Sequence, residues 1–309
     1  MGIINTIMLI GCNGLIGERL TKQLLQQGKT VVGYSRSRPV ITHPNFAFYS
    51  AELSELSIMI RVMQYYQVEA VIHNAALSHP KMAENNPYKM FQINLIGVLN
   101  SIEAASVTNV KRFLFCSAAG VYGNNVSCSI SETAPLKSQC AYDSSKIAAE
   151  EVVKNYGIEC GILRIGFVYG PGRTHECPIA MLLRDVQKTG KAHWNSGSDQ
   201  HLDYIHIEDT IAGMIGAVNA PALHYKIYNL GGGQFTPFNN VIDIVRTLYP
   251  SADIQVGPGG LGYDDIGCMD NSRAREDFGY EPSMPLESGV KGYAQWLLEK
   301  DGCRNIARA

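Results

Sequence analysis

The sequence lacks an excess of charge of either sign. It has 26 Lys and Arg against 28 Asp and Glu in 309 residues, a formal net charge of -2, and no run of Lys or Arg compensates locally. Nucleic acids and anionic membrane surfaces attract proteins that concentrate positive charge. We therefore expect no nucleic acid and no membrane as partners.

The first residues lack the features of a targeting or membrane-spanning segment. The stretch MGIINTIMLI has no basic leader, and its short apolar run continues directly into a glycine-rich loop. A secretory leader begins with positive charge, and a membrane span needs about 20 apolar residues. A cytoplasmic location is the expectation.

Closely spaced cysteine pairs are also missing. The eight cysteines lie at positions 12, 116, 128, 140, 160, 177, 268 and 303, without a Cys-x-x-Cys pair or a cluster of histidines. Zinc sites and disulfide frameworks use close, regular spacings. We therefore predict reduced, structural thiols and no metal site.

What the first half of the chain does contain is an alternation of β-rich and amphipathic segments. Strands are expected at TIMLIG, TVVGYS, FAFYSA, EAVIHNAA, RFLFCS and CGILRI, and helices at GLIGERLTKQLLQQG and NPYKMFQINLIGVLNSIEAAS. This alternation is typical of a parallel sheet with helices on both faces. We predict an α/β fold with a doubly wound, Rossmann-type parallel sheet.

The segment GCNGLIG joins the first expected strand to the first expected helix. Glycines at this spacing allow a tight turn and let main-chain N–H groups approach a pyrophosphate, which the helix dipole also attracts. We therefore predict a dinucleotide cofactor at this loop. The predicted contacts are Gly11, Asn13, Gly14, Leu15, Ile16 and Gly17.

The end of the second expected strand indicates which cofactor is bound. An NAD-binding fold usually has an Asp or Glu here for the adenosine ribose 2′-hydroxyl. This chain has Ser35, Arg36, Ser37 and Arg38 instead. A guanidinium can pair with a 2′-phosphate that a carboxylate would repel. NADP(H) is therefore favoured, with NAD(H) as the alternative, and the first three of these residues are the predicted contacts.

The pattern changes after residue 170, where turns rich in glycine and proline separate shorter elements. We predict an NAD(P)-binding Rossmann domain over residues 1–170, to which roughly residues 203–232 return. A smaller, interleaved substrate-binding lobe is expected over residues 171–309.

Seven motifs in order resemble the extended short-chain dehydrogenase/reductases, the NAD-dependent epimerase/dehydratase family. They are GCNGLIG, VIHNAA, FQINLIGVLN, FLFCSAAGVYG, AYDSSKIAAE, LRIGFVYGPG and LDYIHIEDT. The resemblance implies an enzyme that acts on a small molecule, largely nucleotide sugars in this family, and a homodimer formed by helices that flank the active-site strand. It also implies further cofactor contacts from Glu52, Leu53, Asn74, Ala75, Ala76 and Asn94.

Tyr142 and Lys146 form the expected acid–base centre. Residues four apart on a helix share a face, so the Lys146 ammonium should stabilise a Tyr142 phenolate and lower a pKa that is about 10 when unperturbed. The resemblance implies that the tyrosine exchanges a proton with the substrate oxygen. It also implies that the lysine holds the nicotinamide ribose, so both residues are predicted to be catalytic and cofactor-binding.

One hydroxyl of the family pattern is missing. The family has a Ser or Thr five residues before the glycine of VYG, where it hydrogen-bonds the reacting oxygen, and this chain has Ala118 there. Ser117 precedes it, but neighbouring side chains of a strand point to opposite faces, so Ser117 could replace it only through a local bend. We take Ser117 as the third predicted catalytic residue, with a water or a substrate group as alternatives.

The expected substrate contacts also depart from the family pattern. Members with nucleotide-sugar substrates usually have an Asn in LRxxNVYGP and an Arg before the Asp-Tyr-Ile-His segment, where this chain has Phe167 and Leu202. Charge-assisted phosphate contacts are strong, so their loss weakens the nucleotide-sugar interpretation. Arg173 could serve an anion or could be a solvated loop residue.

The sequence leaves three functions open. The leading hypothesis is NAD(P)-dependent hydride transfer to or from a carbonyl or alcohol of a sugar-like or natural-product substrate, with Tyr142 as acid or base. The first alternative is a nucleotide-sugar epimerase or dehydratase that holds NAD tightly. The second is a non-catalytic, cofactor-binding regulatory protein, which Ala118 suggests.

Overall fold

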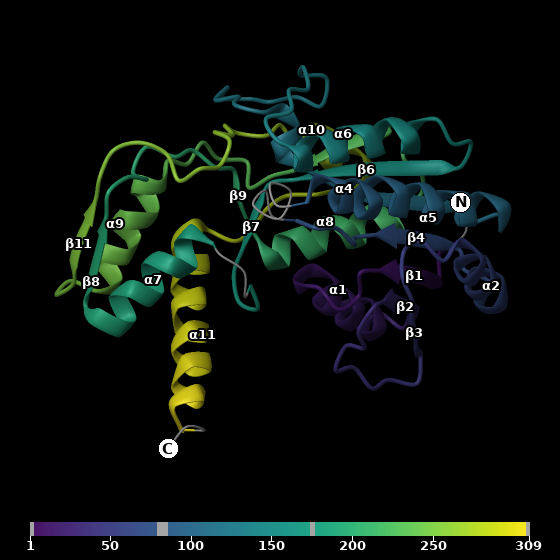
Figure 1. Ribbon diagram of the computed structural model, residues 1–309, viewed down its shortest axis with the longest axis horizontal. Helices are drawn as coiled ribbons and strands as arrows, with labels where there is room; N and C mark the ends of the chain where they lie inside the picture. The colour runs from purple at the N-terminus through teal and green to yellow at the C-terminus, as the bar shows by residue number, and fades with distance from the viewer. Residues whose placement is uncertain (1–2, 79–85, 174–176, 307–309) are drawn as a thin grey trace.

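The computed structural model describes residues 3–78, 86–173 and 177–306, and a seven-stranded sheet forms its centre (Figure 1). The strand order is β3-β2-β1-β4-β5-β6-β10, and every neighbouring pair is parallel. The strands are β1 Thr6–Ile10, β2 Thr30–Ser35, β3 Phe46–Ser50, β4 Ala70–His73, β5 Arg112–Ala118, β6 Glu159–Ile165 and β10 Ile227–Leu230. The predicted doubly wound parallel sheet is therefore confirmed.

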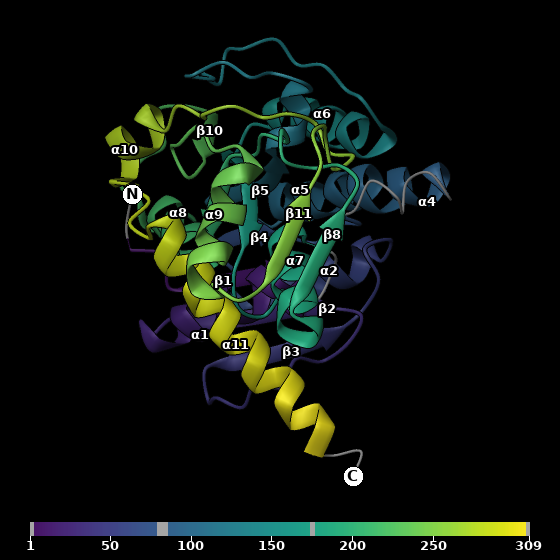
Figure 2. The same cartoon turned by 90° about the vertical axis from the view of Figure 1, so that its left-hand side faces the viewer.

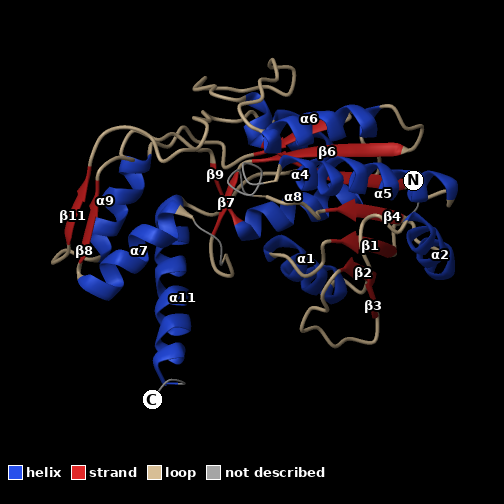
Figure 3. Ribbon diagram, in the orientation of Figure 1, coloured by secondary structure: helices blue, strands red, loops and turns tan. Residues whose placement is uncertain are grey.

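Helices cover both faces of this sheet (Figure 3). On one face lie α1 (Leu15–Gln26) and α8 (Ile207–Asn219), which share an apolar cluster with the sheet. On the other lie α2 (Leu56–Tyr66), α5 (Gly97–Val107) and α6 (Ala141–Lys154). The strands between them are apolar on both faces, as buried parallel strands must be, and every residue of β4 is buried.

The long helix expected at residues 86–106 is present but not uniform. It consists of α4 (Pro87–Phe91), a π-helical turn (Gln92–Ile96) and α5. Residues 87–107 are long and apolar enough to cross a membrane, with a mean hydropathy of 1.2. However, 44% of that window is buried, and α5 packs against α2 and α6. The helix therefore packs against the sheet unit along part of its surface.

A second lobe lies at the left of Figure 1 and has its own apolar core. It contains α7 (Pro178–Thr189), α9 (Phe238–Leu248) and α11 (Leu286–Ile306), with the paired strands β8 (Lys191–Trp194) and β11 (Asp253–Val256). Figure 2 shows α11 extending away from the rest of the molecule toward the C-terminus.

Two further segments connect the lobe to the sheet unit. The strands β7 (Phe167–Tyr169) and β9 (Tyr204–His206) pair with each other between the two parts. The short helix α10 (Ser272–Phe278) packs against α8 and β10.

Candidate active site

The candidate site lies at the carboxyl edge of the sheet, where the strand order changes between β1 and β4. Ligands of doubly wound sheets bind in the crevice at such a switch point. Here the N–H of Gly11 donates to the Tyr34 carbonyl (2.8 Å), and the N–H of Asn74 donates to the Ile10 carbonyl (2.9 Å). The loops after β1, β2 and β4 therefore meet at this edge.

Two glycines allow the first loop to pack closely. Gly11 has a φ of +86°, and a Cβ there would lie 2.7 Å from the Ala75 nitrogen, while a Cβ on Gly17 would overlap the Gly11 carbonyl. Gly14 is exposed at the N-cap of α1, and no side chain caps this helix end. The N–H groups of the first turn, which begins at Leu15 and Ile16, are therefore available to an anion.

The loop after β2 lies beside the glycine loop. The Asn13 side-chain amide donates to the Ser37 hydroxyl (2.6 Å), and Ser35 is the last, half-buried residue of β2. The side chains of Arg36 and Arg38 are exposed, and neither forms an ion pair with another residue in the described part of the chain. Both guanidinium groups are free to meet a ligand.

The loop after β3 contributes mainly backbone and apolar contacts. Glu52 is exposed, and its carbonyl accepts a hydrogen bond from the Tyr34 hydroxyl (2.9 Å). Leu53 packs so closely on α5 that a Cβ on Gly97 would lie 2.7 Å from its Cδ1. The structure thus places Glu52 beside the end of β2 and Leu53 against α5.

Asn94 lies in the π-helical turn, buried, and fixes the loop after β4. Its side-chain oxygen accepts from the Leu77 N–H (2.8 Å), and its amide donates to the Leu77 carbonyl and the Ser145 hydroxyl (3.1 Å each). It therefore joins the loop that contains Ala75 and Ala76 to α6. Single π-helical turns occur frequently at functional sites.

Tyr142 and Lys146 lie in the first two turns of α6 at the same edge. The Lys146 Nζ is 5.9 Å from the centre of the Tyr142 ring, and it donates to the Cys116 carbonyl (2.8 Å). The same ammonium lies 4.8 Å from the centre of the Phe115 ring. Because Lys146 is buried, its pKa falls to about 8.

The expected lowering of the Tyr142 pKa is not what the structure shows. Burial raises this pKa above its ordinary value, and the neighbouring Asp143 raises it further. Lys146 is committed to the Cys116 carbonyl rather than to the phenol. The free protein therefore holds a protonated tyrosine, which suits it as a proton donor.

Ser117 is not brought to the position of the missing hydroxyl. It is buried, and its Oγ donates to Glu150 Oε1 (2.6 Å). Ala118 faces the opposite side of β5, as strand alternation requires, and no local bend turns Ser117 around. The prediction that Ser117 covers the gap is therefore wrong for this structure.

A buried ionic network beneath the site escaped the sequence analysis. Arg164 Nη2 and Glu150 Oε2 are 2.6 Å apart, and both residues are almost completely buried. Although burial opposes its charge, the Glu150 carboxylate raises the pKa of Arg164. Arg164 also donates to the Tyr122 hydroxyl (3.1 Å). An arginine inside the apolar strand segment CGILRI was the available signal, since such charges are paired when buried.

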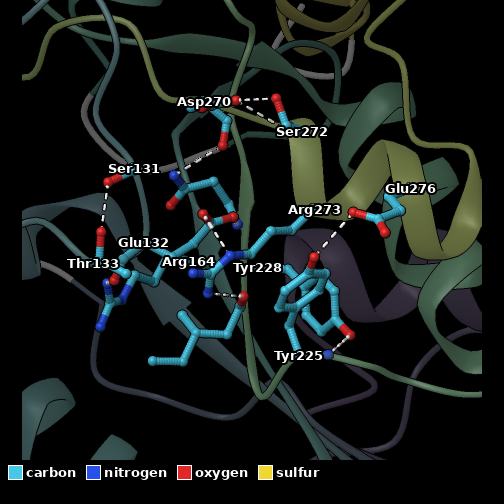
Figure 4. Close-up of polar contacts among 12 residues, drawn as sticks. Ser131, Glu132, Thr133, Arg164, Tyr225, Tyr228, Asp270, Ser272, Arg273 and Glu276 are labelled. Carbon is cyan, nitrogen blue, oxygen red and sulfur yellow. Dashed lines mark hydrogen bonds and ion pairs between the residues drawn. The ribbon is translucent and has the colours of Figure 1, made fainter.

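The network continues to the far edge of the sheet, as Figure 4 shows. Arg164 donates to the Glu132 carbonyl (2.9 Å), and the Glu132 carboxylate accepts from the Asn229 N–H (3.0 Å) of β10. Across from it, Arg273 of α10 approaches Glu132 Oε2 to 3.4 Å and lies over the Tyr225 ring. The segment before α6 is thus tied to β6, β10 and α10.

The residues that the sequence analysis singled out for substrate binding lie on β7, on the loop after it and before β9. Phe167 contacts the Tyr204 and Tyr263 rings edge to face. The Arg173 guanidinium lies 4.6 Å above the Phe167 ring and donates to the Val168 carbonyl. Leu202 is buried in the core of the second lobe, so it offers nothing to a phosphate.

Two histidines and one cysteine of the landmark motifs are structural. Burial lowers the pKa of His73 to about 3, and its Nδ1 lies 3.0 Å from the Ser101 hydroxyl. His206 Nδ1 accepts from the Glu208 N–H at the start of α8 (3.3 Å). Burial raises the pKa of Cys12 to about 12, so its thiol is inert.

Comparison with known proteins identifies the relatives of this chain. A family model described as the NAD dependent epimerase/dehydratase family matches residues 7–231. The UDP-glucuronate 4-epimerase of Thermodesulfobacterium geofontis is 25% identical, over 94% of this chain and 96% of that protein. A putative UDP-glucose 4-epimerase of Methanocaldococcus jannaschii is also 25% identical, over 94% and 98%.

Solved structures share the fold across almost the whole chain. The UDP-glucose 4-epimerase of Thermotoga maritima, solved with UDP-glucose, superposes with a TM-score of 0.85 at 23% identity, covering 96% of this chain and 99% of that one. A dTDP-glucose 4,6-dehydratase of Streptomyces venezuelae, solved with NAD, gives 0.85 at 22% identity, over 96% and 98%.

Proposed function

This chain belongs to the NAD-dependent epimerase/dehydratase family, and from that premise we propose that it transfers hydride between a nicotinamide cofactor and a carbinol or carbonyl carbon of a sugar-like substrate. One observation supports this above all. The Tyr142 and Lys146 pair of α6 lies at the same sheet edge as the glycine loop of β1. An acid–base group and a pyrophosphate cradle therefore share one crevice.

The residues present fit a dinucleotide. The uncapped start of α1 suits a pyrophosphate, because its N–H groups are unused and Gly14 places no side chain over them. Lys146 is close enough to the site to hold the nicotinamide ribose, and Asn13 and Ser37 suit the adenosine ribose. When bound, the cofactor supplies the hydride acceptor or donor.

Tyr142 moves the proton that accompanies this hydride. In the reducing direction its phenol gives a proton to the substrate carbonyl oxygen, so an alcohol forms and a phenolate remains. In the oxidising direction the phenolate takes the hydroxyl proton as the carbon loses hydride. Because burial raises the Tyr142 pKa, we infer that reduction has the higher rate at neutral pH.

We propose NADP(H) as the preferred cofactor of this chain, although solved relatives are described with NAD. The exposed Arg36 side chain follows β2, and no carboxylate stands at this position. Among the predicted contacts Glu52, which follows β3, is the one acidic residue. A 2′-phosphate would thus meet positive charge.

A second candidate is a nucleotide-sugar epimerase that retains its cofactor through each turnover. It is favoured by the full-length relatives, whose names are epimerases. It is disfavoured by Phe167 and the buried Leu202, which cannot pair with a diphosphate. We also propose a homodimer, on the family resemblance.

A single assay separates these functions. Purified protein is examined by absorbance for retained cofactor and is then incubated with NADPH, or with NAD⁺, and a panel of keto sugars, sugars and nucleotide sugars. Net loss of 340 nm absorbance supports the proposed reductase, whereas isomer exchange without net cofactor change supports the epimerase. Cofactor binding without any turnover, even for an Ala118→Ser variant, would support the non-catalytic alternative.

A further inference from the structure

Two departures from the family pattern lie at one end of the crevice. Ala118 lacks the hydroxyl expected for the reacting oxygen, and Phe167 has an aromatic ring where an Asn is usual. Both lie near the carboxyl ends of β5 and β6, because Ala118 is in register with Ile165 of β6 and Phe167 begins β7 two residues later. One explanation should therefore account for both.

The face of the Phe167 ring binds a positive charge. The Arg173 guanidinium lies 4.6 Å above the centre of this ring, within the range of a cation–π interaction, and its Nη1 donates to the Val168 carbonyl. An asparagine at position 167 would offer no such face. The aromatic substitution thus fixes an arginine at the substrate side.

The backbone that carries Arg173 is held from both sides. The Tyr293 hydroxyl of α11 donates to the Arg173 carbonyl (3.1 Å). On the cofactor side, Arg19 donates to the Pro171 carbonyl (3.0 Å), and Gly172 packs so closely that a Cβ there would lie 3.0 Å from Leu15 Cδ1. Arg173 is therefore positioned between the glycine loop and the second lobe.

We propose that Arg173, held over the Phe167 ring, stabilises the negative charge that develops on the reacting oxygen and on Tyr142. In this way Arg173 replaces the hydroxyl group that Ala118 lacks. The proposal rests on the proposed function, of which it describes the active site. It explains why the hydroxyl is dispensable here and why position 167 is aromatic.

The charges around Tyr142 agree with this role. Burial raises the pKa of Tyr142 most, and Asp143 of α6, Cys140 just before this helix and Cys116 of β5 raise it further. Arg173 is the cation that lowers this pKa, whereas Lys146 is bonded to the Cys116 carbonyl. Removing Arg173 would leave the phenolate among groups that oppose it.

The test compares Arg173→Ala and Arg173→Lys with Arg61→Ala, a control at an exposed arginine on α2. Rates of alcohol oxidation are measured against pH in the cofactor-bound protein. For Arg173→Ala we expect kcat to fall about 10²-fold, as for loss of an oxyanion-stabilising donor, and the alkaline midpoint to move upward. Arg173→Lys should retain part of the rate, and Arg61→Ala should match the parent.

Adding Ala118→Ser distinguishes replacement from a general structural effect. If the hydroxyl and the guanidinium serve the same oxygen, Ala118→Ser should raise kcat at least 10-fold in the Arg173→Ala background and much less in the parent. Equal gains in both backgrounds would overturn the proposal. Phe167→Leu, which removes the ring but keeps Arg173, should reproduce part of the loss in kcat. Its rate is compared at a temperature where both proteins are folded, because the variant also loses the ring contacts with Tyr204 and Tyr263.

A readout without turnover separates this proposal from the proposed function. Tyrosinate absorbance near 295 nm is titrated in protein saturated with NADP⁺, with Tyr142→Phe as the blank. Arg173→Ala should move the Tyr142 midpoint upward, and no movement would overturn the proposal even in an active enzyme. If no substrate turns over but the midpoint moves, the proposed reaction fails while the role of Arg173 toward Tyr142 stands.

Discussion

At the scale of single residues, Tyr142 is the group on which the chemistry depends. Tyr142→Phe keeps the ring but removes the proton, so turnover should fall about 10²-fold or more while cofactor affinity changes only a few-fold. Steady-state rates and calorimetric titration with NADPH measure the two quantities. Unchanged turnover would mean that another residue handles the proton.

Arg36 determines the coenzyme in our proposal. Its exposed guanidinium should pair with a 2′-phosphate, and a hydrogen bond to a charged group contributes about 1.5–3 kcal/mol, or roughly a 10- to 100-fold preference for NADPH over NADH. Arg36→Ala should weaken NADPH and spare NADH, with the exposed Arg61→Ala as the control. Equal dissociation constants of both cofactors for the parent protein would contradict the assignment.

The sequence predicted the direction of a side chain correctly where the geometry of its own helix or strand determines it. The spacing of Tyr142 and Lys146 fixed their shared helix face, and strand alternation already indicated that Ser117 points away from the position of Ala118. What the sequence could not show is the partner of Ser117, because Glu150 lies 33 residues later. The raised Tyr142 pKa also depends on burial that only packing creates.

At the scale of elements, the Glu150–Arg164 pair joins α6 to β6 beneath the site. Glu150→Gln removes one charge of a fully buried pair and leaves the other uncompensated, so the free energy of unfolding should fall by about 3 kcal/mol. Ser117→Ala removes one neutral donor to the same carboxylate, which keeps its arginine, and should cost about 1.5 kcal/mol. Urea denaturation of both variants measures the difference.

The same variants test the correction made for Ser117. If Ser117 only supports Glu150, Ser117→Ala should leave turnover within a few-fold of the parent enzyme. A loss near 10²-fold would show that Ser117 reaches the reacting oxygen after all. If Glu150→Gln lowers the free energy of unfolding no more than Ser117→Ala does, the ion pair contributes less to stability than we propose.

Elements were predictable in the sheet unit because each strand is a continuous apolar run bounded by turn residues, as in β1 and β5. The π-helical turn around Asn94 was not, since its sequence is compatible with an ordinary helix. In the second lobe, β8 and β11 pair across about 60 residues of chain. Such short strands leave no periodic signal from which the pairing could be predicted.

At the scale of the whole molecule, the long helix of residues 87–107 offers an apolar surface for the proposed homodimer. It is apolar enough to pass for a membrane span, yet less than half of the relevant window is buried. Ile96 and Val107, eleven residues apart and so on the same face, are exposed at 36% and 51%. A second copy of this chain would cover that face, since the family resemblance implies a dimer through such helices.

We expect the protein to sediment at twice its monomer mass, and Val107→Asp to shift it toward the monomer, because a carboxylate would be desolvated in an apolar interface. Ile96→Asp should act in the same direction. The matched control is Leu298→Asp on α11, an exposed leucine at 47%, which should leave the mass unchanged. Analytical ultracentrifugation at several concentrations measures this mass.

A parent protein that sediments as a monomer at every concentration would contradict the dimer. Dissociation caused by Leu298→Asp instead would show that the interface lies on the projecting helix of the second lobe.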